Sequence, residues 1–266
     1  MAATYHNAPL ISIITVVRND RVGLSRTIAS VARFKGNQTE YTIIDGASTD
    51  DTLSALNSNT HVVDTLVSEP DMGIYDAMNK GIERASGRYL LFLNAGDELL
   101  IDLEAVVKSQ VESPALIYGR VNIVSMDGTL IYVRGKRLFS LHSLLKGMPL
   151  CHQAILYRRD AMMPYDLRFK IISDRVVTYN IASKYGLSNT KFINCIIANS
   201  YDGGVSGKYP YMLRLEEENL FYRSAGKSYY IAIKAINTLF RFKVRYPILR
   251  LFNNKSSSLP ENRIQR

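Results

Sequence analysis

The stretch from Tyr89 to Leu99 constrains the fold of this chain more than any other. It reads YLLFLNAGDEL, so an apolar run of strand length is followed at once by polar, small and acidic residues. An apolar run without alternation is typical of a strand buried on both faces, as in a parallel sheet. Open α/β sheets bind ligands at the carboxyl ends of such strands. Asp97 is therefore predicted either to ligate a hard cation such as Mg²⁺ or Mn²⁺, or to cap a following helix.

Strand-like and helix-like segments alternate through the first third of the chain. β-branched or continuous apolar runs predict strands, and apolar residues that recur every three or four positions predict amphipathic helices. The expected strands are 10–17, 40–44, 62–67 and 89–93, and the expected helices are 22–34, one that ends near residue 56, and 74–83. This order predicts an α/β fold, with a mostly parallel sheet, right-handed crossovers and helices on both faces.

Polar residues directly follow all four of these strands. They are Arg18 with Asn19, Asp45, Glu69 with Asp71, and Asn94 with Asp97. Because the carboxyl ends of parallel strands meet at one edge of a sheet, we expect these residues to share one ligand site. Helix capping accounts well for residues 48–51 but poorly for Asp45. The chain has no GxGxxG after its first strand and no GxxxxGK[ST], so a nucleotide here needs carboxylates and a metal rather than a glycine-rich cradle.

The second half of the chain adds two further polar positions to this pattern. An Asp-Gly pair at residues 127–128 predicts a hairpin between strand-like segments at 115–124 and 129–133. The pair His152-Gln153 opens another strand-like run that ends at residue 157, where a histidine is often a hydrogen-bonded core residue. Asp174 opens an expected helix that ends at residue 185, so it is a natural N-cap. A short helix at 140–146 and a strand at 191–200 complete the expected elements.

The charge and the C-terminal sequence limit the class of partner. A formal charge of +9 indicates an anionic partner, which can be nucleic acid, anionic lipid or nucleotide phosphate. The charge gathers toward the C-terminus and no nucleic-acid recognition module is present, which disfavours nucleic acid. Residues 208–254 predict a basic helical extension, with a helix at 229–246, and residues 255–266 predict a disordered tail. The extension is expected either to dock on anionic lipid or to pack on the preceding domain with a solvated basic face.

The expected compartment is the cytoplasm, with contact at the inner face of the cytoplasmic membrane. The first residues lack the basic and apolar regions of a signal peptide, and no apolar run approaches the ~18 residues that span a bilayer. The two cysteines, Cys151 and Cys195, form neither a disulfide framework nor a zinc-binding spacing, so we expect reduced, buried thiols.

Four motifs in order carry a resemblance to a known family. The stretches ISIITVVRND, IDGASTDDT, SEPDMGIYDAMNKGI and LFLNAGDEL resemble the inverting family 2 glycosyltransferases of the GT-A fold, in particular bacterial enzymes that build O-antigen and other surface polysaccharides. The resemblance covers residues 10–205 and implies a catalytic domain over 1–207, with a nucleotide-sugar half at 10–112 and an acceptor half at 113–207. It also implies transfer of a sugar, with inversion, from a nucleotide-diphosphate sugar such as a UDP-sugar to a hydroxyl of a lipid-linked oligosaccharide.

The resemblance assigns roles to individual residues. Asp174 matches the catalytic base, and Asp97 matches the carboxylate that holds Mn²⁺ or Mg²⁺. Asn94 and Gly96 stand at the first and third places of the family's DxD. His152 and Gln153 fall where sugar or acceptor binds, and Asp45 where the nucleobase, normally uracil, is recognised. The implied nucleotide-sugar site comprises Thr15, Arg18, Asn19, Asp45, Glu69, Asp71, Asp76, Lys80, Asn94, Ala95 and Gly96.

Three other functions stay open from the sequence alone. A nucleotidyltransferase that makes nucleotide sugars normally carries a glycine-rich, basic signature near the first strand, which this chain lacks. A non-catalytic relative that binds nucleotide sugars is compatible with the altered DxD. A basic nucleic-acid-binding protein is the alternative from another class.

Overall fold

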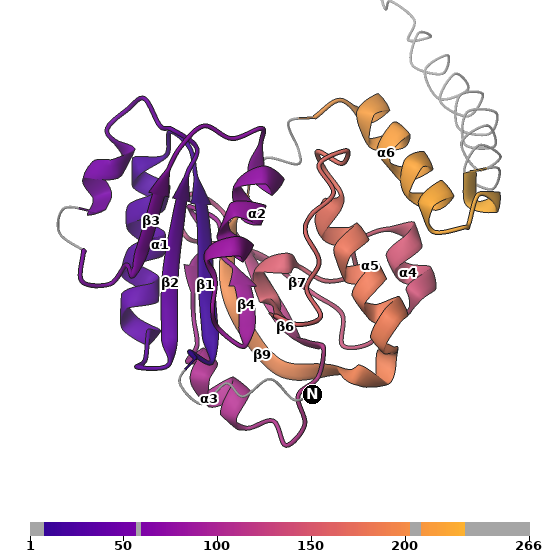
Figure 1. Ribbon diagram of the computed structural model, residues 1–266, viewed down its shortest axis with the longest axis horizontal. Coiled ribbons are helices and arrows are strands. Elements are labelled where there is room, and N and C mark those ends of the chain that lie inside the picture. The colour runs from indigo at the N-terminus through magenta and orange to yellow at the C-terminus, as the bar shows by residue number, and fades with distance from the viewer. Residues whose placement is uncertain (1–7, 57–59, 203–208, 232–266) are drawn as a thin grey trace, which may run out of the picture. The chain divides into compact units, whose positions relative to one another are not determined.

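The computed structural model describes residues 8–56, 60–202 and 209–231. In these ranges a nine-stranded sheet has the order β3-β2-β1-β4-β8-β6-β9-β5, and β7 pairs with β6 off this path (Figure 1). The strands are β1 Ile11–Val17, β2 Thr39–Asp45, β3 Thr65–Ser68, β4 Tyr89–Phe92, β5 Glu98–Leu99, β6 Leu116–Val124, β7 Leu130–Arg134, β8 Ile155–Arg158 and β9 Thr190–Tyr201. The helices are α1 Arg21–Phe34, α2 Ile74–Arg84, α3 Leu103–Lys108, α4 Leu141–Lys146, α5 Ser173–Tyr185 and α6 Tyr211–Ser224, with 3₁₀ turns η1 Thr52–Leu56, η2 His152–Ala154 and η3 Leu187–Asn189.

The first four strands of the chain form the parallel part of the sheet. β1 pairs in parallel with β2 on one side and β4 on the other, and β2 pairs in parallel with β3. All seven residues of β1 are buried, because successive side chains enter two different cores. Ile11 and Ile13 face the core that includes α1, whereas Ile14 and Val16 face the core that includes α2 and α5. The predicted parallel sheet with helices on both faces is confirmed for this half (Figure 1).

The second half of the sheet is mixed, so the sheet as a whole is less parallel than the sequence pattern indicated. β8 runs antiparallel to both β4 and β6, β5 runs antiparallel to β9, and β6 runs parallel to β9. The predicted hairpin is present as the antiparallel pair β6 and β7. The antiparallel direction of β8 brings η2, which precedes it, to the edge where β1, β2 and β4 end.

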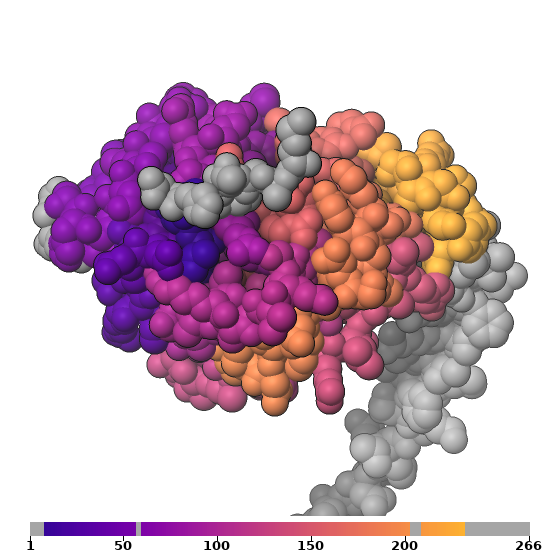
Figure 2. Space-filling view, turned by 60° about the horizontal axis from the view of Figure 1, so that its bottom comes forward, coloured from indigo at the N-terminus to yellow at the C-terminus, as the bar shows by residue number. Residues whose placement is uncertain are grey.

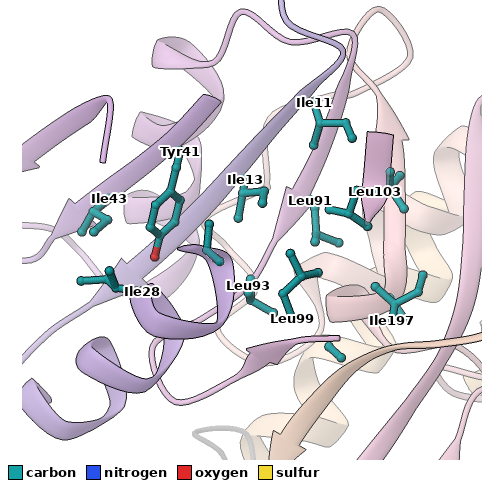
Figure 3. Packing of buried hydrophobic residues seen from close by; sticks show 14 of the residues in the cluster. Ile11, Ile13, Ile28, Tyr41, Ile43, Leu91, Leu93, Leu99, Leu103 and Ile197 are labelled. Atoms are coloured by element: carbon teal, nitrogen blue, oxygen red, sulfur yellow. The ribbon is translucent and has the colours of Figure 1, made fainter. Parts of the chain in front are cut away.

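One core lies beneath the parallel strands on the α1 side. Figure 3 shows Tyr41 between strand and helix residues such as Ile43 and Ile28, with Leu91 and Ile197 in the same layer. The Tyr41 hydroxyl donates to Oγ1 of Thr15 over 3.0 Å, and Thr15 donates to the carbonyl of Leu93 over 2.7 Å. Burial raises the pKa of Tyr41, so its phenol stays neutral. These bonds join the three central strands near their carboxyl ends.

Several elements differ from the sequence prediction. The expected helix near residue 56 is only the 3₁₀ turn η1, and the third strand is shorter and begins later than predicted. Residues 151–154 form a turn rather than the start of a strand. The sequence pattern missed β5 and α3, because two and six residues are too few to show a period. Both missed elements lie near β9. The N–H of Leu100, directly after β5, donates to the carbonyl of Ile197 in β9, and the surfaces of the α3 and β9 regions adjoin in Figure 2.

The chain divides into two compact units, residues 1–214 and 215–266. Within the second unit, the rings of Tyr222 and Tyr230 stack with centroids 5.4 Å apart. The predicted domain boundary at residue 207, the predicted helix beyond residue 231 and the predicted tail at 255–266 lie outside the described residues. None of the helices in the described ranges is long and apolar enough to cross a membrane.

Candidate active site

The loop that follows β2 is held by the carboxylate of Asp45. This side chain is completely buried. Its Oδ2 accepts a hydrogen bond from the Ser68 hydroxyl over 2.6 Å, and its Oδ1 accepts one from the Ser48 hydroxyl over 2.5 Å. Asp45 therefore ties the ends of β2 and β3 together. The nucleobase contact that the family resemblance implies for Asp45 would require this buried carboxylate to become accessible.

The loops after β1 and β2 are joined by Asn19. Its backbone N–H donates to the Ser48 hydroxyl over 2.8 Å, and its side-chain oxygen accepts from the N–H of Thr49 over 2.8 Å. Asn19 has a φ of 51° and Ala47 a φ of 54°, left-handed values that residues other than glycine seldom adopt. Such backbone strain is typical of functional loops that neighbouring contacts hold in place.

Arg18 and Asp71 converge over Gly46. A Cβ at Gly46 would lie 2.1 Å from Oδ2 of Asp71 and 3.4 Å from Cδ of Arg18. The absence of a side chain at Gly46 therefore leaves room for the Asp71 carboxylate, with the aliphatic part of Arg18 beside it. Thr15, in contrast, is buried in the core, where its hydroxyl donates to the carbonyl of Leu93 and accepts from Tyr41, beneath the edge where the family resemblance implies its nucleotide contact.

The loop after β3 is anchored to α2. Nζ of Lys80 lies 2.9 Å from Oε1 of Glu69 and donates to the carbonyl of Pro70 over 2.6 Å. The hydrogen bond with Glu69 raises the pKa of Lys80, so its ammonium is charged. Asp76 lies 4.0 Å from the same ammonium and accepts from the N–H of Met72 over 2.9 Å. These contacts with Lys80 and Asp76 fix the loop, which contains Asp71, to α2.

The turn that follows β4 contains two buried side-chain oxygens that are open to a ligand. Gly96 has a φ of 98°, a conformation that favours glycine. The Thr27 hydroxyl accepts from the N–H of Gly96 over 3.0 Å and donates to the carbonyl of Asp97 over 2.7 Å. Among the residues that the structure describes, Oδ1 of Asn94 and Oδ2 of Asp97 have no hydrogen-bond partner. Ala95 anchors the turn through its N–H, which donates to the carbonyl of Val16 over 3.2 Å.

Asp97 is a buried carboxyl with an unusual titration. Burial raises its pKa to about 6, against the lowering effect of the Ser200 hydroxyl, His152 and Gln153. Carboxylate and amide oxygens are the ligands that Mg²⁺ and Mn²⁺ prefer. No group of three His, Cys, Asp or Glu side chains in the described residues could hold a metal. The residues present fit an ion that takes one or two oxygens from the protein and shares the rest of its coordination with phosphates and water.

His152 lies between this turn and Asp174. Its Nε2 is 3.1 Å from Nδ2 of Asn94, and its Nδ1 is 3.6 Å from Oδ2 of Asp174. Because the Asn94 amide nitrogen can only donate, Nε2 is the acceptor and Nδ1 carries the proton that faces the carboxylate. Gln153 faces the same turn and donates to the Ser200 hydroxyl over 3.3 Å.

Asp174 is positioned by residues from three separate segments. It lies in the first turn of α5, but α5 has no side-chain cap, so the N-cap role that the sequence allows is wrong. The Tyr75 hydroxyl donates to Oδ1 of Asp174 over 3.2 Å. Burial raises the pKa of Asp174, but His152, the N–H of Arg175 and the Tyr75 hydroxyl outweigh it, so the pKa lies below its usual value. The side chain keeps 17% exposure, which leaves an ionised carboxylate open to a ligand.

Sequence reasoning missed Tyr75 and Thr27. Tyr75 stands in the first turn of α2 and is nearly buried, and Thr27 is a buried hydroxyl on the apolar face of α1. A hydroxyl at an apolar helical position was the only available signal for Thr27. Neither residue follows a strand, which is where the sequence pattern directed attention.

Comparison with known proteins identifies the family. A model of glycosyl transferase family 2 matches residues 12–168. A PGL/p-HBAD biosynthesis glycosyltransferase of Mycobacterium tuberculosis is 34% identical over 210 residues, which cover 75% of this chain and 80% of the relative. The putative teichuronic acid biosynthesis glycosyltransferase TuaG of Bacillus subtilis is 32% identical over 126 residues, 46% of this chain and 50% of TuaG.

Solved structures show the same fold at low sequence identity. GalNAc-T7 with UDP, GalNAc and Mn²⁺ has a TM-score of 0.61 at 16% identity, over 82% of this chain and 48% of that one. S. aureus TarS 1-349 has a TM-score of 0.57 at 14% identity, over 72% of this chain and 60% of the TarS chain. These neighbours have the GT-A fold of glycosyltransferases. The extent of the sequence match then settles the assignment: this chain belongs to glycosyl transferase family 2.

Proposed function

We propose that this protein transfers a sugar, with inversion, from a nucleotide-diphosphate sugar to an acceptor hydroxyl during assembly of a cell-surface glycan. One observation carries the proposal: His152 joins the turn that holds Asp97 to the ionised carboxylate of Asp174. The His152 imidazole therefore lies between two carboxyls. On one side is the turn with Asp97, which is suited to a metal and a diphosphate, and on the other is Asp174, which is suited to accept a proton. The names of relatives refer to PGL/p-HBAD and teichuronic acid biosynthesis, which supports a surface glycan as the product.

Asp174 acts as the general base in this proposal. An acceptor hydroxyl has a pKa far above neutral and loses its proton as it attacks, which a positioned carboxylate can assist by about 10²–10⁴-fold. The lowered pKa of Asp174 keeps it ionised at neutral pH. Attack opposite the leaving diphosphate inverts the anomeric carbon and needs no covalent intermediate. A single carboxylate therefore suffices.

Asp97 and Asn94 provide the oxygens that would hold Mn²⁺ or Mg²⁺, which when bound stabilises the charge on the leaving diphosphate. Arg18, whose Cδ lies close to Gly46, follows β1 at the same edge of the sheet, and a guanidinium is suited to phosphate. Structural neighbours are described in complex with UDP-GlcNAc, with GDP-Man and Mn²⁺, and with UDP and Mn²⁺. A UDP-sugar is the proposed donor.

The proposed acceptor is a lipid-linked oligosaccharide at the inner face of the cytoplasmic membrane. The positive charge of the chain and its basic C-terminal sequence support contact with anionic lipid. The proposed place of action is therefore the cytoplasmic surface of that membrane.

The test is release of nucleotide from UDP-, GDP- and dTDP-sugars by the full chain, with Mn²⁺, Mg²⁺ or EDTA. We expect release from one donor, loss of release in EDTA, and loss in Asp174→Asn with donor binding retained. Asp160→Asn, an exposed carboxylate elsewhere, is the matched control. Failure of every donor both to bind in calorimetry and to release nucleotide would remove the donor site. Normal release by Asp174→Asn would remove Asp174 as the base for that reaction.

A further inference from the structure

The edge strand β7 is apolar and exposed on both faces. Leu130, Ile131, Tyr132 and Val133 have exposed fractions of 54%, 50%, 52% and 44%. Successive residues of a strand point to opposite sides, so a hairpin that packs on its own protein should bury every second one. β7 buries neither set, and it pairs only with β6 among the described strands. Exposed apolar surface of this kind marks a site of interaction.

The apolar surface extends beyond β7 along the same hairpin. Met126 is 70% exposed and Leu138 is 79% exposed. We define the β6–β7 hairpin surface as residues 126–138. Its Asp127 carboxylate lies at the tip, where it accepts hydrogen bonds from the Ser125 hydroxyl and the N–H of Thr129.

Three exposed cations follow β7 or end it. They are Arg134, Lys136 and Arg137, against the single acidic side chain of Asp127 in the hairpin surface. Apolar side chains next to lysine and arginine form the pattern of a segment that lies in the interface of an anionic bilayer. A second copy of this chain paired edge to edge would bring the same cations together, as would the basic C-terminal sequence of the chain itself. Charge complementarity therefore favours anionic lipid as the occupant.

The hairpin surface begins beside the candidate active site. Val124 at the end of β6 pairs with Tyr201 of β9, one residue after the Ser200 that contacts Gln153 and lowers the pKa of Asp97. On the return side, the N–H of Lys136 donates to the carbonyl of Pro149 over 3.1 Å, shortly before His152. Both ends of the hairpin surface are thus attached to segments that build the site.

We infer that the β6–β7 hairpin surface docks on anionic lipid, with the apolar side chains of β7 among the headgroups and acyl ends and the cations on lipid phosphates. Docking holds the active-site edge at the membrane. Lipid binding by the hairpin is independent of the proposed function. The statement that the docked site meets a lipid-borne acceptor rests on it.

A fluorescence measurement tests insertion directly. The chain contains no tryptophan, so a single one reports its own surroundings. We expect full-length Tyr132→Trp to show a blue shift with vesicles of phosphatidylcholine and phosphatidylglycerol, and no shift with phosphatidylcholine alone. Val111→Trp, at an apolar position outside the hairpin surface that is even more exposed than Tyr132, should not shift. An unshifted Tyr132→Trp spectrum in bound protein would overturn the inference.

Vesicle sedimentation tests the contributions of charge and apolar surface. Lys136→Gln/Arg137→Gln should weaken binding by about 25-fold, because each surface cation contributes about a factor of five. Leu130→Ser/Tyr132→Ser should weaken binding as well, whereas Arg33→Gln/Arg84→Gln and Val111→Ser should not. Unchanged thermal unfolding confirms that the variants fold. Equal loss of binding in the control variants would contradict a lipid-specific hairpin. Hairpin variants that lose self-association but keep lipid binding would contradict it as well.

The assay contains neither donor nor acceptor, so its outcome is independent of catalysis. Hairpin-dependent binding by a chain that fails every donor test would leave the lipid surface in place and remove the proposed function. Donor turnover by a chain whose vesicle binding does not depend on the hairpin would support the proposed function and remove the lipid surface.

Discussion

His152 faces Asp174 with its Nδ1 atom 3.6 Å from Oδ2 of the carboxylate. The other ring nitrogen faces Asn94, 3.1 Å away, in the turn that contains Asp97. His152 thus acts on both carboxyls, because it lowers the pKa of Asp174 and opposes the rise in the pKa of Asp97. His152, together with the N–H of Arg175 and the Tyr75 hydroxyl, lowers the pKa of Asp174 and so favours its ionised form.

Replacing His152 should change the acidity of Asp174. The contacts of His152 lower the pKa of that carboxyl, so His152→Ala should raise it. A base works only when ionised, so the acidic limb of the kcat profile should move to higher pH. His61→Ala, an exposed histidine elsewhere, should leave the profile in place. A reduced kcat with an unmoved acidic limb would show that His152 does not tune the base.

Asp97 should make the metal-free protein less stable as pH rises. Its folded pKa of about 6 lies above its ordinary value of 3.8, so the stabilising neutral form is complete below about pH 4 and is lost as pH rises through 6. A rise of this size corresponds to roughly 3 kcal/mol. Asp97→Asn should therefore show a flatter free energy of unfolding between pH 4 and 7, by urea titration in EDTA.

The same variant separates metal binding from packing. Mn²⁺ should raise the Tm of the wild type at neutral pH and leave that of Asp97→Asn nearly unchanged. Glu112→Gln, at an exposed site, should behave as the wild type in both measurements. An equal Mn²⁺ response in Asp97→Asn would place the ion elsewhere.

Gly46→Ala should weaken donor binding more than it weakens the fold. The new Cβ would fall 2.1 Å from Oδ2 of Asp71, so that carboxylate must move, whereas 3.4 Å from Cδ of Arg18 is ordinary van der Waals contact. Loss of one hydrogen bond between Asp71 and the donor should weaken binding by about tenfold in calorimetry. Gly147→Ala is the matched control, because Gly147 has an extended φ of 172° and no atom within 4 Å of the added carbon. Equal affinities in the two variants would argue against a donor site over Gly46.

Thr15→Val should reduce stability without changing donor affinity. The change leaves the buried Tyr41 hydroxyl without its acceptor and the carbonyl of Leu93 without its donor, at a cost of about 1–3 kcal/mol. Because Thr15 is fully buried, the donor Kd should stay the same. Thr15→Ser keeps the hydroxyl and should restore most of the free energy of unfolding. A large change in the donor Kd with normal stability would show that Thr15 contributes to nucleotide binding.

The sequence predicted the parallel half of the fold well because its signals are local. Strands such as Ile11–Val17 are continuous apolar runs, and the polar residue after each run marks the edge at which it ends. The convergence of Arg18 and Asp71 over Gly46 follows from this edge rule. The two-residue strand β5 carries no such signal, since it exists only through pairing with the distant β9.

The arrangement within the site depended on contacts that no local pattern encodes. Asp45 follows a strand as the pattern requires, but its enclosure depends on Ser68, which β3 brings beside it. The contact between His152 and Asp174 depends on the antiparallel direction of β8, which turns η2 toward the edge. Periodicity gives the faces of single elements, whereas these pairings depend on how distant elements dock.

The unbroken sheet also limits how the protein can move. β4, in the half of the chain before residue 113, is hydrogen-bonded to β8, in the half after it, through Leu90 and Tyr157. A hinge between the halves, such as two-domain enzymes use to close on a ligand, would break these backbone bonds. Opening and closing must therefore be confined to loops and side chains at the rim, and substrate exchange should proceed on the timescale of loop motion rather than of domain rotation.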